Sequence, residues 1–416
     1  MVLVLAVSAC VYPDPDPGPL YHARAIETAL QVGNLELARS ARTLARQRHS
    51  YNGTVLWWSA RVSQMLGQDQ TARAELQGLL QTADRAGITE AEIKGQIGGL
   101  LFRMGNYGES IPYLEAGSVG PEADRRQAFG RLARELPYVR TQIGALATEL
   151  PLVEDSLPEL ICSIGDIQRA FALDSGTSMT TLSQTLAEEL LVTNIRPVGM
   201  TTHDNGEAYP VSIGVLRRFA VGDVQLGSIP VLVVEDQRLT LRDMFGGAEQ
   251  TRGGVVGMDL LSIFRMTIDL DRQSVVMEVP RGLPEADSVR CLWLRGRWIV
   301  PVTIEGRQLW FILDTGASHS SLTPQGLEAL ANGPERATPT YRRVRSAGGT
   351  MISVRELTGL VLRAAGMRFS GVQLPVVPRG PSPIFPIHGV LGADLLLLCR
   401  MTLDSGRLRL EARTGR

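Results

Sequence analysis

The stretch WFILDTGASHSSLT at residues 310–323 decides the fold, because a near copy, AFALDSGTSMTTLS, lies at residues 170–183. In each copy an apolar run ends at an aspartate, which a hydroxyl residue and a glycine follow. A second pair of stretches keeps the same order. GVVGMDLLSIFRMTIDLD begins at Gly254, and GVLGADLLLLCRMTLDSG begins at Gly389. Two matched blocks at nearly equal offsets indicate an internal duplication, so we expect two similar lobes.

The motifs DSGTS and DTGAS resemble the two catalytic loops of the aspartic peptidases, and each unit is similar in size to the retroviral-type members. The resemblance covers residues 152–411 and implies a mostly β, bilobal, retropepsin-like domain in which each lobe donates one aspartate. It implies that Asp174 and Asp314 are catalytic. It also implies a set of supporting loop residues and the glycines of a second signature: Ser175, Gly176, Thr177, Thr315, Gly316, Ala317, Gly257 and Gly392.

Elementary chemistry explains the motif of an apolar strand, an aspartate, a hydroxyl residue and a glycine. An apolar strand delivers the aspartate to a buried loop, and the glycine allows a turn where a Cβ would collide with the facing loop. Two carboxylates held close together cannot both ionise readily, so they share one proton, as in aspartic proteases. One then acts as a base toward water while the other polarises the scissile carbonyl, with no metal or cofactor. Thr177 offers a hydroxyl where Ala317 offers none, so we expect the shared proton on Asp314.

Several other residues between and after these motifs have two interpretations. Gly-rich stretches around Gly206 in the first lobe, and around Gly348 and Gly349 in the second, predict either flaps over a cleft or ordinary surface hairpins. His319 aligns with Met179, which favours a surface or packing role. Each second signature is followed by an aspartate that we expect at a helix start or on the surface: Asp259 and Asp394.

Residues 20–150 have apolar positions at helical spacing. Phrases beginning at Gly33, Gly67 and Gly105 recur at 34 and then 38 residues and resemble tetratricopeptide repeats; a plain helical bundle is the alternative. In that family the glycine closes a turn and a small residue five positions on packs between helices, here Ala38, Ala72 and Ser110. We expect an interaction module that can bind a protein partner. The predicted regions are 1–19, 20–150, 151–280 and 281–416.

The first residues, MVLVLAVSAC, resemble the end of a bacterial lipoprotein signal, in which VSAC matches the lipobox and Cys10 is acylated. The implied location is the periplasmic side of the cell envelope, with attachment by lipid alone and a Pro-rich tether. A buried N-terminal segment is the alternative. The remaining cysteines have no metal or redox spacing, and Cys162 and Cys399, which lie in apolar strand-like stretches, are expected to be buried.

The composition and net charge argue against nucleic acid as a partner. The 416 residues carry a net charge of -1, with 44% apolar and 20% charged residues, so no basic field is available for nucleic acid. The combined prediction is a multidomain chain with a helical-repeat domain and an aspartic endopeptidase that cleaves peptide or protein substrates. A catalytically silent peptide- or protein-binding scaffold is one alternative. A regulatory protease that cuts one partner recruited by the helices is another.

Overall fold

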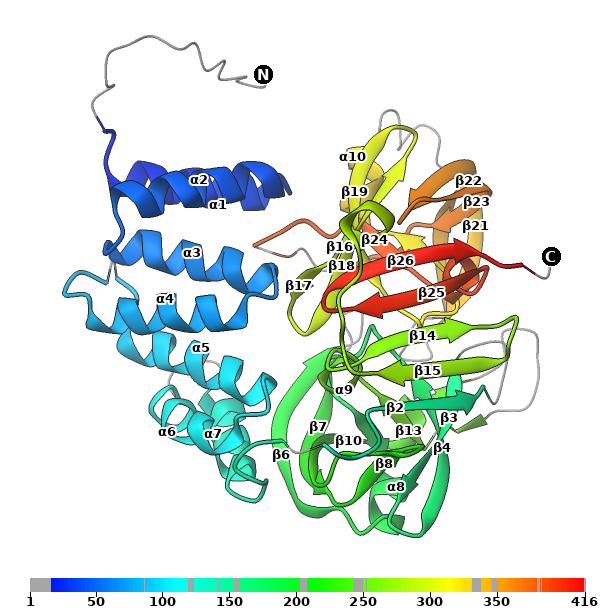
Figure 1. Ribbon diagram of the computed structural model, residues 1–416. Helices are drawn as coiled ribbons and strands as arrows, with labels where there is room; N and C mark the ends of the chain where they lie inside the picture. The colour runs from blue at the N-terminus through cyan, green and yellow to red at the C-terminus, as the bar shows by residue number, and fades with distance from the viewer. Residues whose placement is uncertain are drawn as a thin grey trace.

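The computed structural model describes residues 16–414, apart from 86, 119–122, 141, 153–157, 203–207, 242–249, 252, 331–337, 346–350, 380–381 and 383. It has a stack of helices on one side and a larger β body on the other (Figure 1). Cys10, Gly206, Gly348 and Gly349 lie outside the described residues.

The helical region consists of helices that pack in successive antiparallel pairs, α1 with α2, α3 with α4 and α5 with α6. The predicted glycines Gly33, Gly67 and Gly105 lie in the turns within these pairs, and all have positive φ, which glycine adopts without strain. Asn34 and Asn52 cap α2 and α3 through their side chains. The bounds are α1 (Pro19–Gln31), α2 (Leu35–Arg48), α3 (Gly53–Met65), α4 (Asp69–Gln81), α5 (Glu90–Arg103), α6 (Tyr107–Ala116) and α7 (Ala123–Ala133).

The predicted end of the helical region near residue 150 is wrong. The last helix ends at Ala133, and β2 (Ala147–Pro151) forms a strand that pairs with β15 (Ser274–Glu278). The physical reason is that β15 presents an edge, which the arriving chain covers with backbone hydrogen bonds. Pro151 falls at the end of this edge strand, where a missing N–H does little harm.

The first lobe is built on one sheet, with strand order β1-β9-β8-β3-β4-β13-β5-β10-β7-β6 in the described residues. β4 lies parallel to β13, so that Leu173 is paired with Val256. The bounds are β1 (Ile143–Gly144), β3 (Glu159–Ile164), β4 (Ile167–Leu173), β5 (Thr181–Ser183), α8 (Gln184–Glu189), β6 (Thr193–Thr202), β7 (Ala208–Leu216), β8 (Phe219–Val221), β9 (Val224–Gln225), β10 (Ile229–Val234), η1 (Asp236–Arg238), β11 (Thr240–Leu241), β12 (Gln250–Thr251), β13 (Gly254–Val256) and α9 (Met258–Leu261).

The second lobe repeats this plan, as the duplication predicts. β19 lies parallel to β24, and Leu313 is paired with Leu391 in the position that Leu173 and Val256 occupy in the first lobe. The bounds are β17 (Leu292–Leu294), β18 (Arg297–Ile304), β19 (Arg307–Leu313), β20 (Ser321–Leu322), α10 (Pro324–Ala329), β21 (Thr338–Arg345), β22 (Met351–Ala364), β23 (Met367–Pro375), β24 (Gly389–Leu391) and α12 (Ala393–Leu396).

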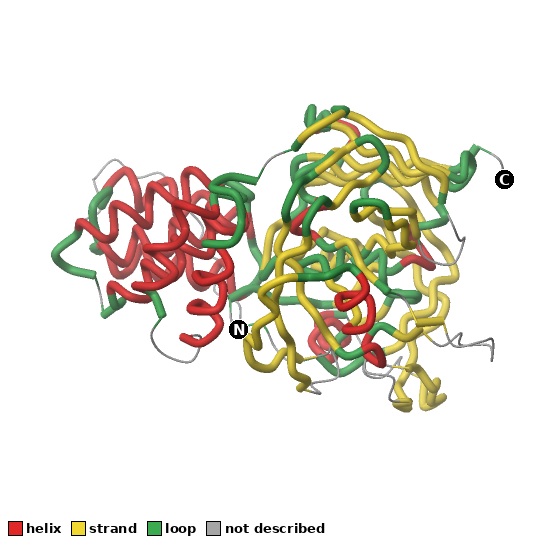
Figure 2. The backbone as a smooth tube through the Cα atoms, turned by 90° about the horizontal axis from the view of Figure 1, so that it is seen from below, coloured by secondary structure: helices red, strands yellow, loops and turns green. Residues whose placement is uncertain are grey.

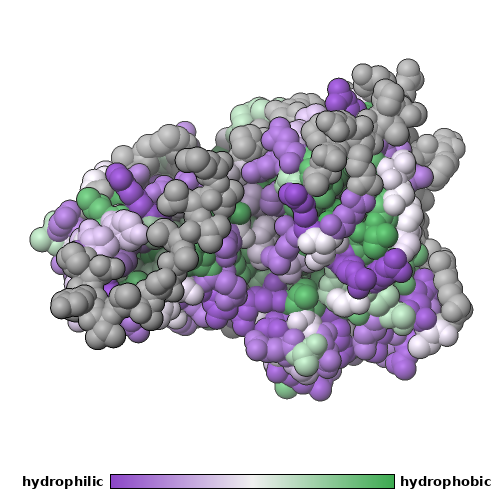
Figure 3. Space-filling model, turned by 90° about the horizontal axis from the view of Figure 1, so that it is seen from above, coloured by the Kyte–Doolittle hydropathy of each residue, from purple (hydrophilic) through white to green (hydrophobic). Residues whose placement is uncertain are grey.

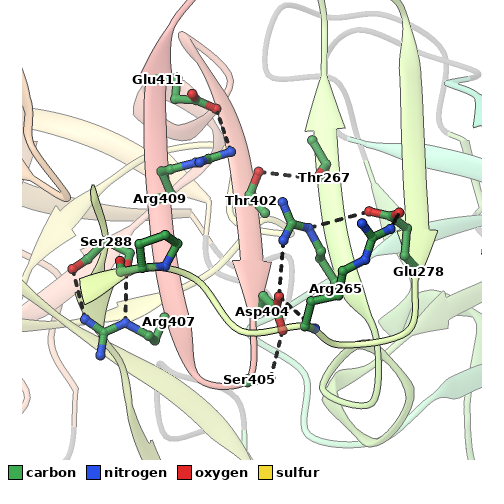
Figure 4. Close-up of polar contacts among 12 residues, drawn as sticks. Arg265, Thr267, Glu278, Ser288, Thr402, Asp404, Ser405, Arg407, Arg409 and Glu411 are labelled. Atoms are coloured by element: carbon green, nitrogen blue, oxygen red, sulfur yellow. Dashed lines mark hydrogen bonds and ion pairs between the residues drawn. The ribbon is translucent and has the colours of Figure 1, made fainter. Parts of the chain in front are cut away.

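A third sheet joins the lobes, with strand order β16-β26-β25-β14-β15-β2. At its centre Thr267 faces its duplicate Thr402, with 3.2 Å between the Oγ1 atoms (Figure 4). Arg265 lies 3.5 Å from the buried carboxylate of Asp404. The remaining bounds are β14 (Arg265–Asp269), η2 (Glu285–Asp287), β16 (Val289–Arg290), β25 (Cys399–Asp404) and β26 (Arg407–Ala412).

The helical region docks on both lobes. At the second lobe, Trp310 donates its indole N–H to the carbonyl of Gly33 at 2.9 Å, within an apolar cluster of residues from α1, α3 and β17. At the first lobe, Leu132 of α7 packs with Val198 and Ile213 of β6 and β7. Figure 2 shows the helical region on one side of the β body, and Figure 3 shows hydrophilic residues spread over both parts.

Two smaller expectations concern membranes and cysteines. Among the described residues, no helix has both the length and the apolar character needed to cross a bilayer. Cys162 and Cys399 are buried free thiols, as expected, and so is Cys291; burial raises the pKa of Cys399 to about 11.

Candidate active site

Each candidate aspartate follows directly on a buried strand. β4 ends at Leu173 and β19 ends at Leu313, so Asp174 and Asp314 occupy the same place in the two lobes. The backbone N–H of Asp174 donates to Val256 O at 3.1 Å, and that of Asp314 donates to Leu391 O at 3.0 Å. The parallel strand in each lobe therefore fixes where the aspartate leaves the sheet.

The loop glycines show how closely the two loops approach each other. A Cβ added to Gly176 would lie 2.3 Å from the carboxyl carbon of Asp314, and one added to Gly316 would lie 2.4 Å from that of Asp174. At such distances a side chain at either position would displace the carboxyl group of the opposite lobe. Each carboxyl group therefore lies against the glycine of the opposite lobe, and the two aspartates face one another across the lobe boundary.

A reciprocal set of buried hydrogen bonds locks the loops together. Ser175 Oγ donates to Leu313 O at 2.9 Å and accepts from Thr315 N at 3.0 Å. Thr315 Oγ1 donates to Leu173 O at 2.6 Å and accepts from Ser175 N at 3.0 Å. Both hydroxyl residues are fully buried. We call these four bonds the cross-lobe grip; every donor and acceptor in it belongs to a strand end or loop that carries an aspartate.

The carboxylates accept different hydrogen bonds. Asp174 accepts from Gly176 N at Oδ1 and from Thr177 Oγ1 at Oδ2, both at 2.7 Å. Asp314 Oδ1 accepts from Gly316 N at 3.1 Å and from Ala317 N at 2.9 Å. The Thr177 hydroxyl, for which the second lobe has Ala317, therefore donates to the carboxylate of its own lobe.

Comparison with known proteins agrees with this geometry. Residues 160–260 and 300–395, one segment from each lobe, match a family model described as aspartyl protease. The matched segments contain Asp174 and Asp314 and span a little less than half of the chain. Among solved structures it is similar to a retropepsin-like aspartic protease from Rickettsia conorii, at 17% identity and a TM-score of 0.24, over 34% of this chain and 96% of that one. No curated protein matches the chain.

The glycines of the second signature pack closely against the segments that follow the two aspartate loops. A Cβ on Gly257 would lie 2.4 Å from the backbone of Met179, and one on Gly392 would lie 2.7 Å from that of His319. Both glycines are therefore required by close backbone approach. His319 itself is partly exposed and contacts Ser318, in keeping with a surface or packing role.

Sequence reasoning missed the contribution of the aspartates after these glycines. Asp259 and Asp394 lie in the first turns of α9 and α12, as expected. Asp259 Oδ1 accepts from Thr180 N at 2.7 Å and from its hydroxyl at 3.0 Å, and Asp394 Oδ1 accepts the matching bonds from Ser320 at 2.8 and 2.6 Å. The sequence contains a signal for this contact, because both copies of the duplication have a hydroxyl residue and an aspartate at equivalent positions: Thr180 with Asp259, and Ser320 with Asp394.

Burial shifts the pKa of Asp259. Desolvation raises the pKa of this carboxyl to about 6, and the hydrogen bonds from Thr180 and the charge of Arg140 offset only part of that rise. Arg140, in the segment after α7, donates to the backbone carbonyl of Asp259 at 3.0 Å. The segment that follows the helical region therefore contacts Asp259, which supports the loop of Asp174.

The remaining predicted features lie away from the two aspartates or beyond the described residues. The strands β6 and β7 lead to the stretch around Gly206, and β21 and β22 lead to Gly348 and Gly349, but the tips themselves lie outside the description. Among the described residues, one group has side chains of metal-ligating type within reach of each other: Asp16, His22 and His49. It belongs to the helical region.

Proposed function

We propose that the chain is an aspartic endopeptidase that hydrolyses peptide bonds with Asp174 and Asp314. The cross-lobe grip is the observation that carries the proposal, because it joins the loops of Asp174 and Asp314 so that each carboxyl group lies against the glycine of the opposite lobe. A binding scaffold needs no such arrangement, whereas two carboxyl groups held together from two lobes are suited to proton transfer to and from a bound water molecule.

The mechanism follows from the asymmetry of the pair. Asp174, whose Oδ2 accepts the Thr177 hydroxyl, takes a proton from a water molecule as the water oxygen attacks the carbonyl carbon. Asp314 donates its proton to the carbonyl oxygen. The tetrahedral intermediate then collapses: the C–N bond breaks, the leaving nitrogen takes the proton that Asp174 holds, and a hydroxyl of the intermediate returns its proton to Asp314 as the new carboxyl group forms. Both carboxyl groups return to the state with one shared proton.

A randomised peptide library tests this proposal directly. The parent, Asp174→Asn and Asp314→Asn are incubated with it from about pH 3 to pH 8, and cut sites are read by mass spectrometry. Asp166→Asn is the matched control, because Asp166 is exposed in the turn between β3 and β4. We expect each active-site variant to lose at least about a hundredfold in rate, and the control to lose nothing. Cleavage that survives in either active-site variant contradicts the proposal.

We also propose roles for the other regions. Three helix pairs with glycine turns support an interaction module similar to tetratricopeptide repeats. The sequence around Cys10 supports a lipid anchor at the cell envelope, and mass spectrometry of the N-terminal peptide from membranes tests it. An unmodified Cys10 in the mature protein would exclude the anchor.

A further inference from the structure

A cavity of about 790 Å³ lies where the helical region meets the protease domain. Residues of α3, α5 and α7 form one wall, and Ser178, Met179 and the turn at Arg295 and Gly296 form the other. α3 and β17 lie side by side at this junction (Figure 1). A Cβ on Gly296 would lie 2.5 Å from that of Ser178, so this turn of the second lobe touches the first catalytic loop.

The cavity is adjacent to the catalytic machinery. Ser178 directly follows Thr177, whose hydroxyl binds Asp174. A peptide chain bound across the two aspartates would therefore need only a few extended residues, at about 3.3 Å each, to reach the cavity. Its volume is in the range of sites that enclose a small ligand or a short stretch of chain.

The charge of the lining is strongly positive. Its described residues include one carboxylate, Asp259, and a set of arginines from both parts of the chain: Arg61, Arg103, Arg125, Arg126, Arg140 and Arg295. Two further carboxylates lie close by. Asp69 binds Arg103 at 2.6 Å, and the pKa of Glu92 is lowered first by hydrogen bonds from Thr89 and then by the charges of Arg126 and Arg61. The arginines still outnumber these acids two to one.

Several of these arginines are held in place by contacts within the chain. Arg103 stacks on the Trp293 ring at 4.9 Å, and Arg140 and Arg126 each donate one Nη1 hydrogen bond to a backbone carbonyl. A guanidinium holds its five N–H donors in a rigid fork, so a contact at one of them fixes the orientation of the group. Arg125 and Arg295 are exposed at the rim. The site is thus preorganised for carboxylates, which arginine binds in bidentate fashion.

The wall also leaves room for a backbone. Gly99 of α5 lines the cavity, and a Cβ added there would meet nothing within 4 Å. Apolar surface from Met179, Phe129 and Leu294 alternates with the charged groups. This mixture suits a peptide that carries acidic and apolar side chains better than it suits a small free anion.

We propose that this cavity binds an acidic segment of the substrate beside the scissile bond, so that the helical region makes the protease selective for peptides rich in Asp and Glu. The proposal rests on the proposed function, since it names the substrate class of the same site. It assigns Arg125 and Arg295 as specificity residues, one from α7 and one from the β17–β18 turn.

Binding to the uncleaving Asp174→Asn protein tests this without requiring turnover. The probes are fluorescein-labelled peptides with a Leu-Phe centre flanked by glutamates, by glutamines or by lysines, followed by fluorescence anisotropy. We expect the glutamate peptide to bind at least about tenfold more tightly than the glutamine peptide, and the difference to shrink between about 0.05 M and 0.5 M salt. Adding Arg125→Glu with Arg295→Glu should remove the preference.

Arg131→Glu is the matched control, because Arg131 is an exposed arginine of the same helix that does not line the cavity. Equal affinity for the glutamate and glutamine peptides would overturn the proposal, as would an equal loss from Arg131→Glu. The two proposals can fail separately. A parent that cleaves the library without acidic preference contradicts the cavity assignment alone, whereas arginine-dependent binding by a parent that cleaves nothing contradicts the protease assignment alone.

Discussion

The cross-lobe grip predicts that Thr315→Val destabilises the protease domain far more than its small change in shape suggests. Valine keeps the β-branched shape and the packing, but it removes Oγ1. Leu173 O and Ser175 N then lose their partners while both residues remain fully buried. An unpaired buried group costs about 1–3 kcal/mol, so the two together cost about 2–6 kcal/mol. That is a large fraction of the free energy of unfolding of a domain, which is about 5–15 kcal/mol.

Urea unfolding followed by tryptophan fluorescence measures this loss, since Trp293, Trp298 and Trp310 all lie in the second lobe. With a slope of about 3 kcal/mol per molar urea, the midpoint should fall by about 0.7–2 M. Thr315→Ser is the matched control, because it keeps the hydroxyl and loses one methyl group, worth about 1 kcal/mol. If the valine and serine variants unfold at the same urea concentration, the grip does not stabilise the domain and the reasoning is refuted.

Three further outcomes are expected. Gly316→Ala should abolish peptide cleavage, because its Cβ would lie 2.4 Å from the carboxyl carbon of Asp174; full activity in a rate assay would contradict the close approach. The pKa of Asp259 is raised from 3.8 to about 6, so the folded state holds the proton more tightly and stability should fall as pH rises from about 4 to 6, by at most about 3 kcal/mol. Unfolding midpoints across that range should show this fall in the parent but not in Asp259→Asn. If the midpoints of both proteins change equally with pH, Asp259 is not the group responsible. Arg265→Ala leaves the buried Asp404 carboxylate without its cation and should cost about 3 kcal/mol in calorimetry or urea unfolding, whereas a cost near zero would show that its other hydrogen bonds suffice.

The duplication made much of the protease domain predictable. The two copies of the motif fixed which strands carry Asp174 and Asp314, and the offset between the copies predicted two lobes with one plan. The glycine turns at Gly33, Gly67 and Gly105 could be located because a positive φ strongly favours glycine. These inferences succeed because they depend on local backbone geometry and on a repeated pattern.

Features that depend on contacts between distant segments could not be predicted. The bond from Trp310 to Gly33 joins residues far apart in sequence, and nothing local marks either as its partner. The strand at residues 147–151 follows helical texture and is strand only because β15 offers an edge. The cavity arginines are scattered along the chain, so their convergence follows from docking of the helical region on both lobes.

The central claim is that one chain forms one active site from its two lobes. Cleavage rates of the parent, Asp174→Asn, Asp314→Asn and an equimolar mixture of the two variants test it most directly. The account predicts an active parent, two inactive variants and an inactive mixture, because each chain already pairs its own two loops. Recovery of activity in the mixture would show that the site forms between chains, and activity in either single variant would show that the two aspartates do not act together.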